Sequence, residues 1–214
     1  MRFDNGNGDA FQMRGRVWRS AVGLCVVAET EVDTPLAERA ASEARREGRG
    51  QPQSAKPSIT DKLTGAGNHE RLDEAFAAEL TRVQRTGVPL SVMMAAPDGY
   101  ADLARMQGQE VADKVLAHSG FLMRLLTRPA DIVTRFTTAQ FVVLLPHTNL
   151  AQAMSAAERL RIVFAKDPVE AIGAPVTCSF GVAEYQSGED LMTFVDRAGA
   201  ALLHAGPDVV SAAS

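Results

Sequence analysis

The apolar residues beyond residue 58 follow two kinds of spacing, and these kinds alternate along the chain. Between Leu72 and Val83 they recur at intervals of four, four and three residues, which predicts an amphipathic helix over residues 70–85 that ends at Gly87. Short apolar runs between breaking residues predict buried strands. By these criteria we expect further helices over residues 111–125, 150–164 and 191–204, and strands over residues 90–95, 132–136, 141–145 and 176–185.

Two of the expected strands lie close together in the chain. Residues 132–136 and 141–145 are both rich in β-forming residues and are separated by only four residues, which is typical of a β-hairpin. Helices and strands alternate on either side of this hairpin. The predicted fold class is therefore α/β, of the α+β type, with a mixed central sheet flanked by helices.

The chain before residue 58 has a different composition. Residues 37–58 begin as a charged, Ala-rich stretch and end in Gly, Gln, Pro and Ser without an apolar stripe, which predicts a short helix and a flexible linker. Residues 17–27 fit a strand or a helix equally well. We expect an N-terminal extension with helical content and a linker over residues 1–57, and one domain over residues 58–214.

The charge balance argues against a protein that binds DNA through bulk positive charge. The chain has 22 Lys and Arg against 26 Asp and Glu, a net charge of −4, whereas neutralising DNA phosphates requires an excess of basic groups. The two cysteines, Cys25 and Cys178, form neither a disulfide framework nor a metal cluster and fit a reducing compartment. The apolar run over residues 21–28 is too short to span a bilayer. We therefore expect a cytoplasmic protein without a membrane span.

Five short strings beyond residue 58 occur in a characteristic order. They are Asp61-Lys62-Leu63-Thr64-Gly65 with Asn68, Gly108 with Asp113 and Leu116, Arg135-Phe136 with residues 141–146, Ser179 to Ala183, and Ala198 to Ala205. No single string is specific, but together they resemble the GGDEF domain of diguanylate cyclases, which join two GTP molecules into cyclic di-GMP. The resemblance covers about residues 58–210 and implies the nucleotidyl cyclase-like fold of that family.

The same resemblance implies that several catalytic positions of the family are changed in this chain. The signature Gly-Gly-Asp/Glu-Glu-Phe aligns with Thr137-Thr138-Ala139-Gln140-Phe141, and the first metal-binding Asp aligns with Ala96. The family's reaction depends on cations, usually magnesium, held between carboxylates and triphosphate. We therefore expect a degenerate domain that is not an enzyme, with no magnesium site and no cofactor. The two threonines should also alter the hairpin turn, because β-branched residues resist positive φ.

The guanine-contacting positions of the family are only partly retained. Its Asn aligns with Ala104, while its Asp is present as Asp113. A late Lys that contacts phosphate aligns near Gly206. The four histidines have no metal-ligand spacing.

A second group of residues resembles the family's product-inhibition site, where cyclic di-GMP binds. Arg128-Pro129-Ala130-Asp131 begins nine residues before Thr137, the spacing of the family's Arg-x-x-Asp motif. The second arginine of that site aligns with Arg159, and a third, which a neighbouring domain contributes in some members, aligns with Arg82. A guanidinium group can bond guanine or phosphate through two parallel contacts, and a carboxylate can accept the guanine N–H groups. The resemblance therefore implies a cyclic di-GMP site at these four residues.

These features predict a cyclic di-GMP receptor that relays the signal to an unidentified signalling protein. The relay would use the N-terminal segment, the domain surface or a homodimer, because ligand must favour one arrangement over another. The alternative is an interaction scaffold that retains the fold and binds no nucleotide. A third and weaker hypothesis is residual cyclase or GTP-activated behaviour, with residual GTP binding through the retained Asp113.

Overall fold

The computed structural model describes residues 2–4, 10–12, 14–20, 23–29 and 58–213. The chain divides into two compact units, Met1–Pro57 and Ser58–Ser214. In the first unit, β1 (Arg2–Asp4) pairs with β2 (Ala10–Gln12), and β3 (Arg14–Ser20) pairs with β4 (Gly23–Glu29), both antiparallel. Of the ambiguous stretch, residues 17–20 therefore fall in β3 and residues 23–27 in β4. The short helix and linker were expected within residues 37–58, and residues 37–57 of this stretch lie outside the described residues.

The second unit is built on one five-stranded sheet in the order β11-β10-β5-β7-β6. Only β11 runs parallel to its neighbour, and the other pairs are antiparallel. The mixed sheet flanked by helices confirms the predicted fold class. Its strands are β5 (Leu90–Pro97), β6 (Ile132–Arg135), β7 (Phe141–Pro146), β10 (Cys178–Glu184) and β11 (Val210–Ala212), and β8 (Pro168–Val169) and β9 (Ala174–Pro175) form a separate small hairpin.

In this unit the structure confirms the four predicted helices and adds α3 (Tyr100–Gln107), which was not predicted. The others are α2 (His69–Thr86), α4 (Gln109–Leu126), α5 (Leu150–Phe164) and α6 (Leu191–Ala205). Gly87 ends α2 in the left-handed conformation with φ of 68°. A break at Gly108, with φ of 92°, divides α3 from α4. None of the helices in the described part of the chain combines the length and apolar character needed to cross a membrane.

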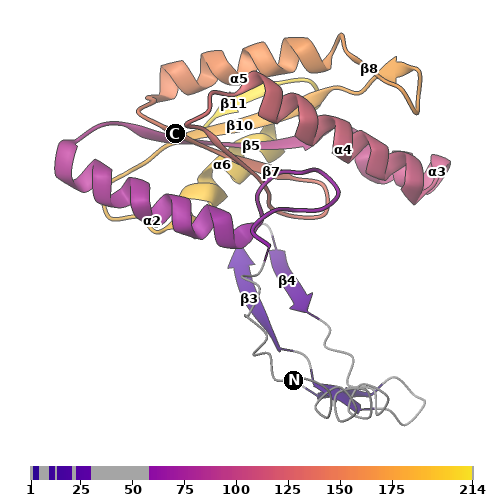
Figure 1. Ribbon diagram of the computed structural model, residues 1–214, viewed down its shortest axis with the longest axis horizontal. Coiled ribbons are helices and arrows are strands. Elements are labelled where there is room, and N and C mark those ends of the chain that lie inside the picture. The colour runs from indigo at the N-terminus through magenta and orange to yellow at the C-terminus, as the bar shows by residue number, and fades with distance from the viewer. Residues whose placement is uncertain (1, 5–9, 13, 21–22, 30–57, 214) are drawn as a thin grey trace, which may run out of the picture. The chain divides into compact units, whose positions relative to one another are not determined.

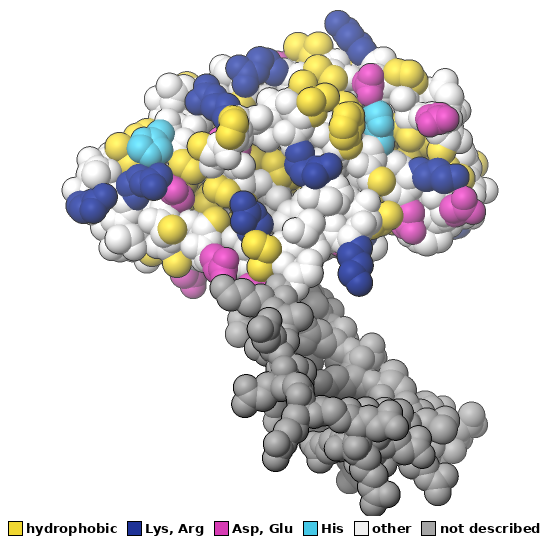
Figure 2. Space-filling model, in the orientation of Figure 1, with side chains coloured by type: hydrophobic (Ala, Val, Ile, Leu, Met, Phe, Trp, Pro, Cys, Tyr) yellow, Lys and Arg dark blue, Asp and Glu magenta, His cyan; other side chains and the backbone are white. Residues whose placement is uncertain are grey.

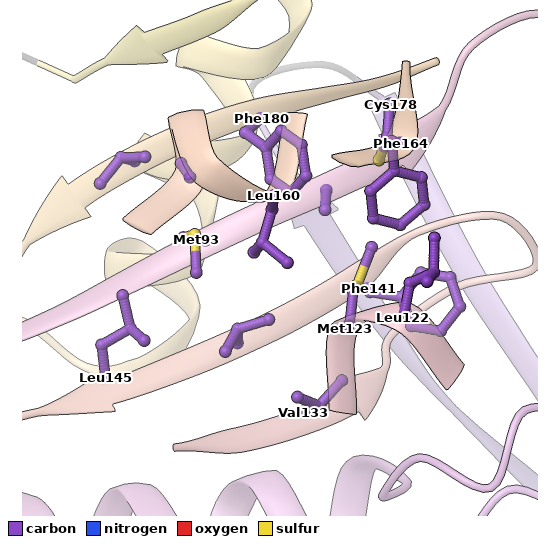
Figure 3. Packing of buried hydrophobic residues seen from close by; sticks show 14 of the residues in the cluster. Met93, Leu122, Met123, Val133, Phe141, Leu145, Leu160, Phe164, Cys178 and Phe180 are labelled. Atoms are coloured by element: carbon purple, nitrogen blue, oxygen red, sulfur yellow. The ribbon is translucent and has the colours of Figure 1, made fainter. Parts of the chain in front are cut away.

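Two apolar cores lie on opposite faces of the sheet. The first contains Phe141, Phe164 and Phe180 and joins the sheet to α4 and α5. Figure 3 shows Leu160 and Phe164 of α5 lying over the strands that carry Phe141 and Phe180. The second core contains Leu72 and Phe194 and joins the sheet to α2 and α6. Figure 1 shows this layering, with α4 and α5 on one side of the sheet and α2 and α6 on the other.

Candidate nucleotide-binding site

The loop that opens the second unit is held against the edge strand β6. The Gly67 amide donates to the Val133 carbonyl at 2.8 Å, and the Arg135 amide donates to the Gly67 carbonyl at 2.8 Å. Gly67 thus extends the sheet beyond its last strand. Asn68 then caps α2 by accepting a hydrogen bond from the Arg71 amide at 3.2 Å. This arrangement brings the first turn of α2 to the edge of the sheet.

Asp61 organises the turn within this loop. Its Oδ1 accepts the Thr64 amide at 2.9 Å and the Thr64 hydroxyl at 2.7 Å, and Arg135 Nη1 lies 3.3 Å from its Oδ2. Burial by itself would raise the pKa of the Asp61 carboxyl, but the bonds from Thr64 and the charge of Arg135 outweigh it. The pKa of Asp61 is therefore lowered, and the group is a stable anion within the turn.

Arg128 and Asp131 form a compact turn between α4 and β6. The Arg128 amide donates to Asp131 Oδ2 at 2.8 Å, and the Asp131 amide donates to the Arg128 carbonyl at 3.0 Å. The side chain of Asp131 thus caps its own loop, which leaves the Arg128 guanidinium exposed. Burial raises the pKa of the Asp131 carboxyl, while the Arg128 amide and the charges of Arg128 and Arg159 act in the opposite direction.

Arg159 and Arg82, the other two predicted site residues, have different surroundings. Arg159 is exposed on α5, and its charge acts on the carboxyl of Asp131, although the two residues belong to separate elements. Arg82 lies near the end of α2, where its Nη1 bonds Glu79 at 3.0 Å and lies 3.4 Å from His147 Nε2. In this structure Arg128 and Asp131 share one turn, Arg159 is exposed on α5, and Arg82 is paired with Glu79 of its own helix.

A pocket of about 340 Å³ opens beside the Arg128 turn. Arg71 of α2 and Arg124 of α4 line it together with Arg128 and Asp131, and neither of the first two was predicted from the sequence. The i, i+4 spacing of Arg124 and Arg128 across the end of α4 is a sequence signal for Arg124, and Arg71 has no such signal. The other lining residues are Thr60, Gly65, Gly67, Thr127, Pro129, Ile132 and Val133. Figure 2 shows Lys and Arg side chains spread over the face that carries α2 and α4.

The hairpin between β6 and β7 closes without left-handed residues. The Phe136 amide donates to the Gln140 carbonyl at 2.8 Å, and Thr137 Oγ1 donates to Gln140 Oε1 at 3.2 Å. Within the described chain, positive φ among non-glycine residues occurs only at His147 and Asp208. Thr137 and Thr138 therefore adopt ordinary backbone conformations here, and Arg135 Nη2 holds the loop by donating to the Thr138 carbonyl at 2.8 Å. Ala139 packs against the first core.

The position aligned with the family's metal-binding Asp lies beside a partly buried polar network. Ala96 is paired with Ser179 across β5 and β10. Two residues later, Asp98 accepts hydrogen bonds from the Thr177 hydroxyl at 2.6 Å, the Ser179 hydroxyl at 2.7 Å and the Asp208 amide at 2.9 Å. Asp98 therefore joins the ends of two central strands to the segment before β11.

The remaining candidate positions lie on or after helices. Ala104 is in α3, and Gly206 ends α6. Asp113 is in α4, where its Oδ1 accepts a hydrogen bond from Gln109 at 2.7 Å. Among the residues that the structure describes, no three His, Cys, Asp or Glu side chains gather as a metal-binding group.

Comparison with known proteins identifies the family. Residues 58–208 match the family described as "Diguanylate cyclase, GGDEF domain". The chain belongs to the GGDEF family. The diguanylate cyclase DgcP of Pseudomonas aeruginosa is 34% identical over 149 residues, which are 69% of this chain and 22% of DgcP. The response regulator PleD of Caulobacter vibrioides is 28% identical over 123 residues, 58% of this chain and 26% of PleD. The GGDEF chain thus spans about a quarter of the length of these relatives.

Solved structures share the fold. Diguanylate cyclase SiaD of Pseudomonas aeruginosa, in complex with its activator SiaC, has a TM-score of 0.68 at 31% identity, covering 83% of this chain and 67% of SiaD. The GGDEF domain of DgcB from Caulobacter crescentus, in complex with c-di-GMP, has a TM-score of 0.68 at 19% identity, covering 74% of this chain and 97% of that one. The predicted GGDEF-type fold is confirmed.

Two predictions made from the residue types are wrong. The expectation that the protein is not an enzyme is contradicted by a family and relatives that are named as diguanylate cyclases. The expectation of no cofactor and no magnesium site is contradicted as well, because diguanylate cyclases of this family depend on magnesium. The physical reason is that a cation site consists of ligands that meet in space. The residue types at Ala96, Ala139 and Gln140 do not by themselves define it.

Proposed function

We propose that this GGDEF domain binds cyclic di-GMP at Arg128, Asp131 and Arg159 and transmits the binding event to a protein partner. The observation that carries the proposal is the Arg128–Asp131 turn, in which the Arg128 amide donates to Asp131 Oδ2 at 2.8 Å and both residues line one pocket. A guanine base could donate its N–H groups to Asp131, while the Arg128 guanidinium group donates hydrogen bonds to O6 and N7 of the same base. The bound c-di-GMP of the DgcB domain and the activator complex of SiaD support this hypothesis by analogy.

The proposed transmission is a population shift. Cyclic di-GMP would bridge the Arg128 turn and α5, either within one domain or between two copies. Binding then favours the conformation or the dimer in which the turn and Arg159 of α5 contact the ligand together. In this scheme Arg82 contacts cyclic di-GMP that is bound to a second copy of the domain. Its hydrogen bond to Glu79 must then break so that its guanidinium group can bind the ligand. We further propose residues 58–214 as the binding domain, residues 1–57 as the extension that the partner reads, and the cytoplasm as the location.

Calorimetric titration of the full chain with cyclic di-GMP tests this function. We expect Arg128→Ala to weaken binding about 10- to 100-fold, since charge-assisted hydrogen bonds contribute about 1.5–3 kcal/mol. Arg105→Ala is the matched control, because Arg105 forms an exposed ion pair with Asp102 on α3. Flat heats for the unsubstituted protein would refute the proposal and favour the nucleotide-independent scaffold. A size measurement with and without ligand detects pairing of two copies.

Synthesis of cyclic di-GMP is a second candidate function, which the similarity to DgcP favours. The full chain is incubated with GTP and magnesium, and the products are separated by chromatography. Formation of cyclic di-GMP that falls with Asp113→Ala would support this candidate, and unchanged GTP would contradict it. Under the first proposal, Arg128→Ala relieves inhibition of this synthesis by its own product.

A further inference from the structure

Three arginines line the pocket beside the Arg128 turn, one from α2 and two from the end of α4 and the turn after it. Arg71 comes from the first turn of α2, Arg124 from the last turn of α4, and Arg128 from the turn that follows it. Asp131 is the one acidic residue that lines the pocket. Within the described residues, no carboxylate oxygen lies within 4.0 Å of a side-chain nitrogen of these arginines. The pocket therefore carries an excess of positive charge.

Two glycines make room for the unpredicted arginines. A Cβ atom on Gly65 would lie 2.9 Å from Arg124 Nη1, and a Cβ on Gly67 would lie 2.8 Å from Arg71 Cδ. Arg124 also donates from Nη1 to the Gly65 carbonyl at 3.1 Å and from Nε to the Gly120 carbonyl at 3.3 Å. Both side chains thus lie directly against the opening loop. Arg124 is held in place by backbone groups, which leave its positive charge uncompensated.

This combination of charge and geometry matches a phosphate group. Phosphate accepts paired hydrogen bonds from guanidinium groups, and a fork already held in place loses less side-chain entropy on binding. The pocket volume of about 340 Å³ falls within the range of small-molecule sites. Asp131 at its edge accepts N–H groups, so the pocket suits a ligand with both phosphate and N–H donors.

We infer that this pocket is a phosphate-binding subsite in which Arg71 and Arg124 hold a phosphate group of a guanine nucleotide. The inference deepens the proposed function, and it depends on that proposal for the identity of the natural ligand. It adds two residues of α2 and α4 to the site that Arg128 and Asp131 share with Arg159. Arg71 acts through direct bonds to phosphate, and Arg124 combines such bonds with its anchoring of the Gly65 turn.

Titrations of the full chain with inorganic pyrophosphate and with cyclic di-GMP, at low ionic strength, test the subsite. We expect Arg71→Ala to weaken pyrophosphate binding about 10-fold, the effect of losing one charge-assisted contact. Arg71→Lys should retain part of the affinity, because it keeps the charge and loses the planar fork. Arg105→Ala should leave the affinity unchanged. Arg71 is exposed, so these variants are expected to fold, which circular dichroism verifies.

The two ligands separate the subsite from the proposed function. Cyclic di-GMP binding that requires Arg128 but is insensitive to Arg71→Ala would overturn the subsite and leave the proposed function intact. Pyrophosphate binding that depends on Arg71, in a protein that does not bind cyclic di-GMP, would retain the subsite and refute the function. No pyrophosphate binding, or equal losses in the Arg71→Ala and Arg105→Ala variants, would overturn the inference.

Discussion

Arg135 and Asp61 connect the opening loop to the β6–β7 hairpin, although 74 positions separate them in the chain. Arg135 Nη1 lies 3.3 Å from Asp61 Oδ2, while Nη2 of the same side chain donates to the Thr138 carbonyl at 2.8 Å. Both partners of the ion pair are largely buried, with side-chain exposures of 18% and 23%. One guanidinium group therefore orients the turn that precedes α2 and the loop that carries the family signature.

Replacement of Asp61 by Asn should destabilise the domain and change its acid response. We expect a loss of about 1–2 kcal/mol in the free energy of unfolding at pH 7, because a charged acceptor for Thr64 and Arg135 is removed. The pKa of Asp61 is lowered in the folded protein, so its stabilisation is present above the ordinary Asp value and is lost as pH falls through the folded value.

Urea unfolding of the full chain between pH 3 and pH 8 measures this effect. The difference between Asp61→Asn and the unsubstituted protein should shrink toward the acid end. Asp102→Asn, which disrupts an ion pair whose side chains are 75% and 73% exposed, serves as the control and should have almost no effect. A constant difference across the pH range would contradict the electrostatic role of Asp61.

Gly181 should tolerate no side chain. It lies in β10, where an added Cβ would overlap the Ala198 carbonyl oxygen and the Leu202 amide nitrogen of α6. Because both obstacles are backbone atoms, α6 must move away, and we expect Gly181→Ala to cost about 3 kcal/mol or more. Gly199→Ala, in α6 itself, is the matched control. The Cβ atom of this alanine would meet only the flexible end of the Met94 side chain, at 3.2 Å. Similar thermal midpoints for the two variants would refute this packing argument.

Removal of the Asp98 carboxylate should destabilise the end of the central sheet. Asp98→Ala leaves the Thr177 hydroxyl and the Asp208 amide without their acceptor, while the Ser179 hydroxyl keeps the Gly206 carbonyl at 3.0 Å. A buried donor left unsatisfied costs about 1–3 kcal/mol, and because water can reach these two partly buried donors we expect a total loss of about 1–3 kcal/mol. Denaturant titration measures this loss, and Asp98→Asn should recover part of it. Unchanged stability in Asp98→Ala would contradict a structural role for the network.

Binding of cyclic di-GMP should weaken in mild acid, at a higher pH than for an ordinary aspartate site. Burial raises the pKa of the Asp131 carboxyl, so its protonation, which converts one acceptor oxygen into a donor, begins above the pH expected for an ordinary aspartate. Affinities measured from pH 3.5 to pH 7.5 should fall toward acid, and Asp131→Asn should show weak, pH-independent binding. An affinity that does not change over this range would argue against Asp131 as a guanine acceptor.

The same shift has the opposite sign for stability. A carboxyl whose pKa is raised on folding binds its proton more tightly in the folded state, so its contribution to stability improves as pH falls. Asp131→Asn should therefore be at least as stable as the unsubstituted protein at pH 7, since Asn can still accept the Arg128 amide. A clear loss of stability in this variant would show that the charge of Asp131 supports the turn.

Local sequence patterns by themselves determined most helices and strands of the domain. The apolar face of α2 and its end at Gly87 follow from residue spacing and glycine conformation, which are properties of a few neighbouring residues. The two-residue strands β8 and β9 and the three-residue β11 escaped prediction, because such short strands depend on partners distant in sequence.

The site divides in the same way. The Arg128–Asp131 turn is local, and its spacing from the hairpin was readable in the sequence. Whether the residue types at the hairpin exclude catalysis was not readable, because that depends on groups meeting in space. Only the tertiary structure brought Arg71 and Arg124 beside Arg128. It does so because Gly67 pairs with the edge of β6 and because glycine at positions 65 and 67 lets both arginine side chains lie against the loop.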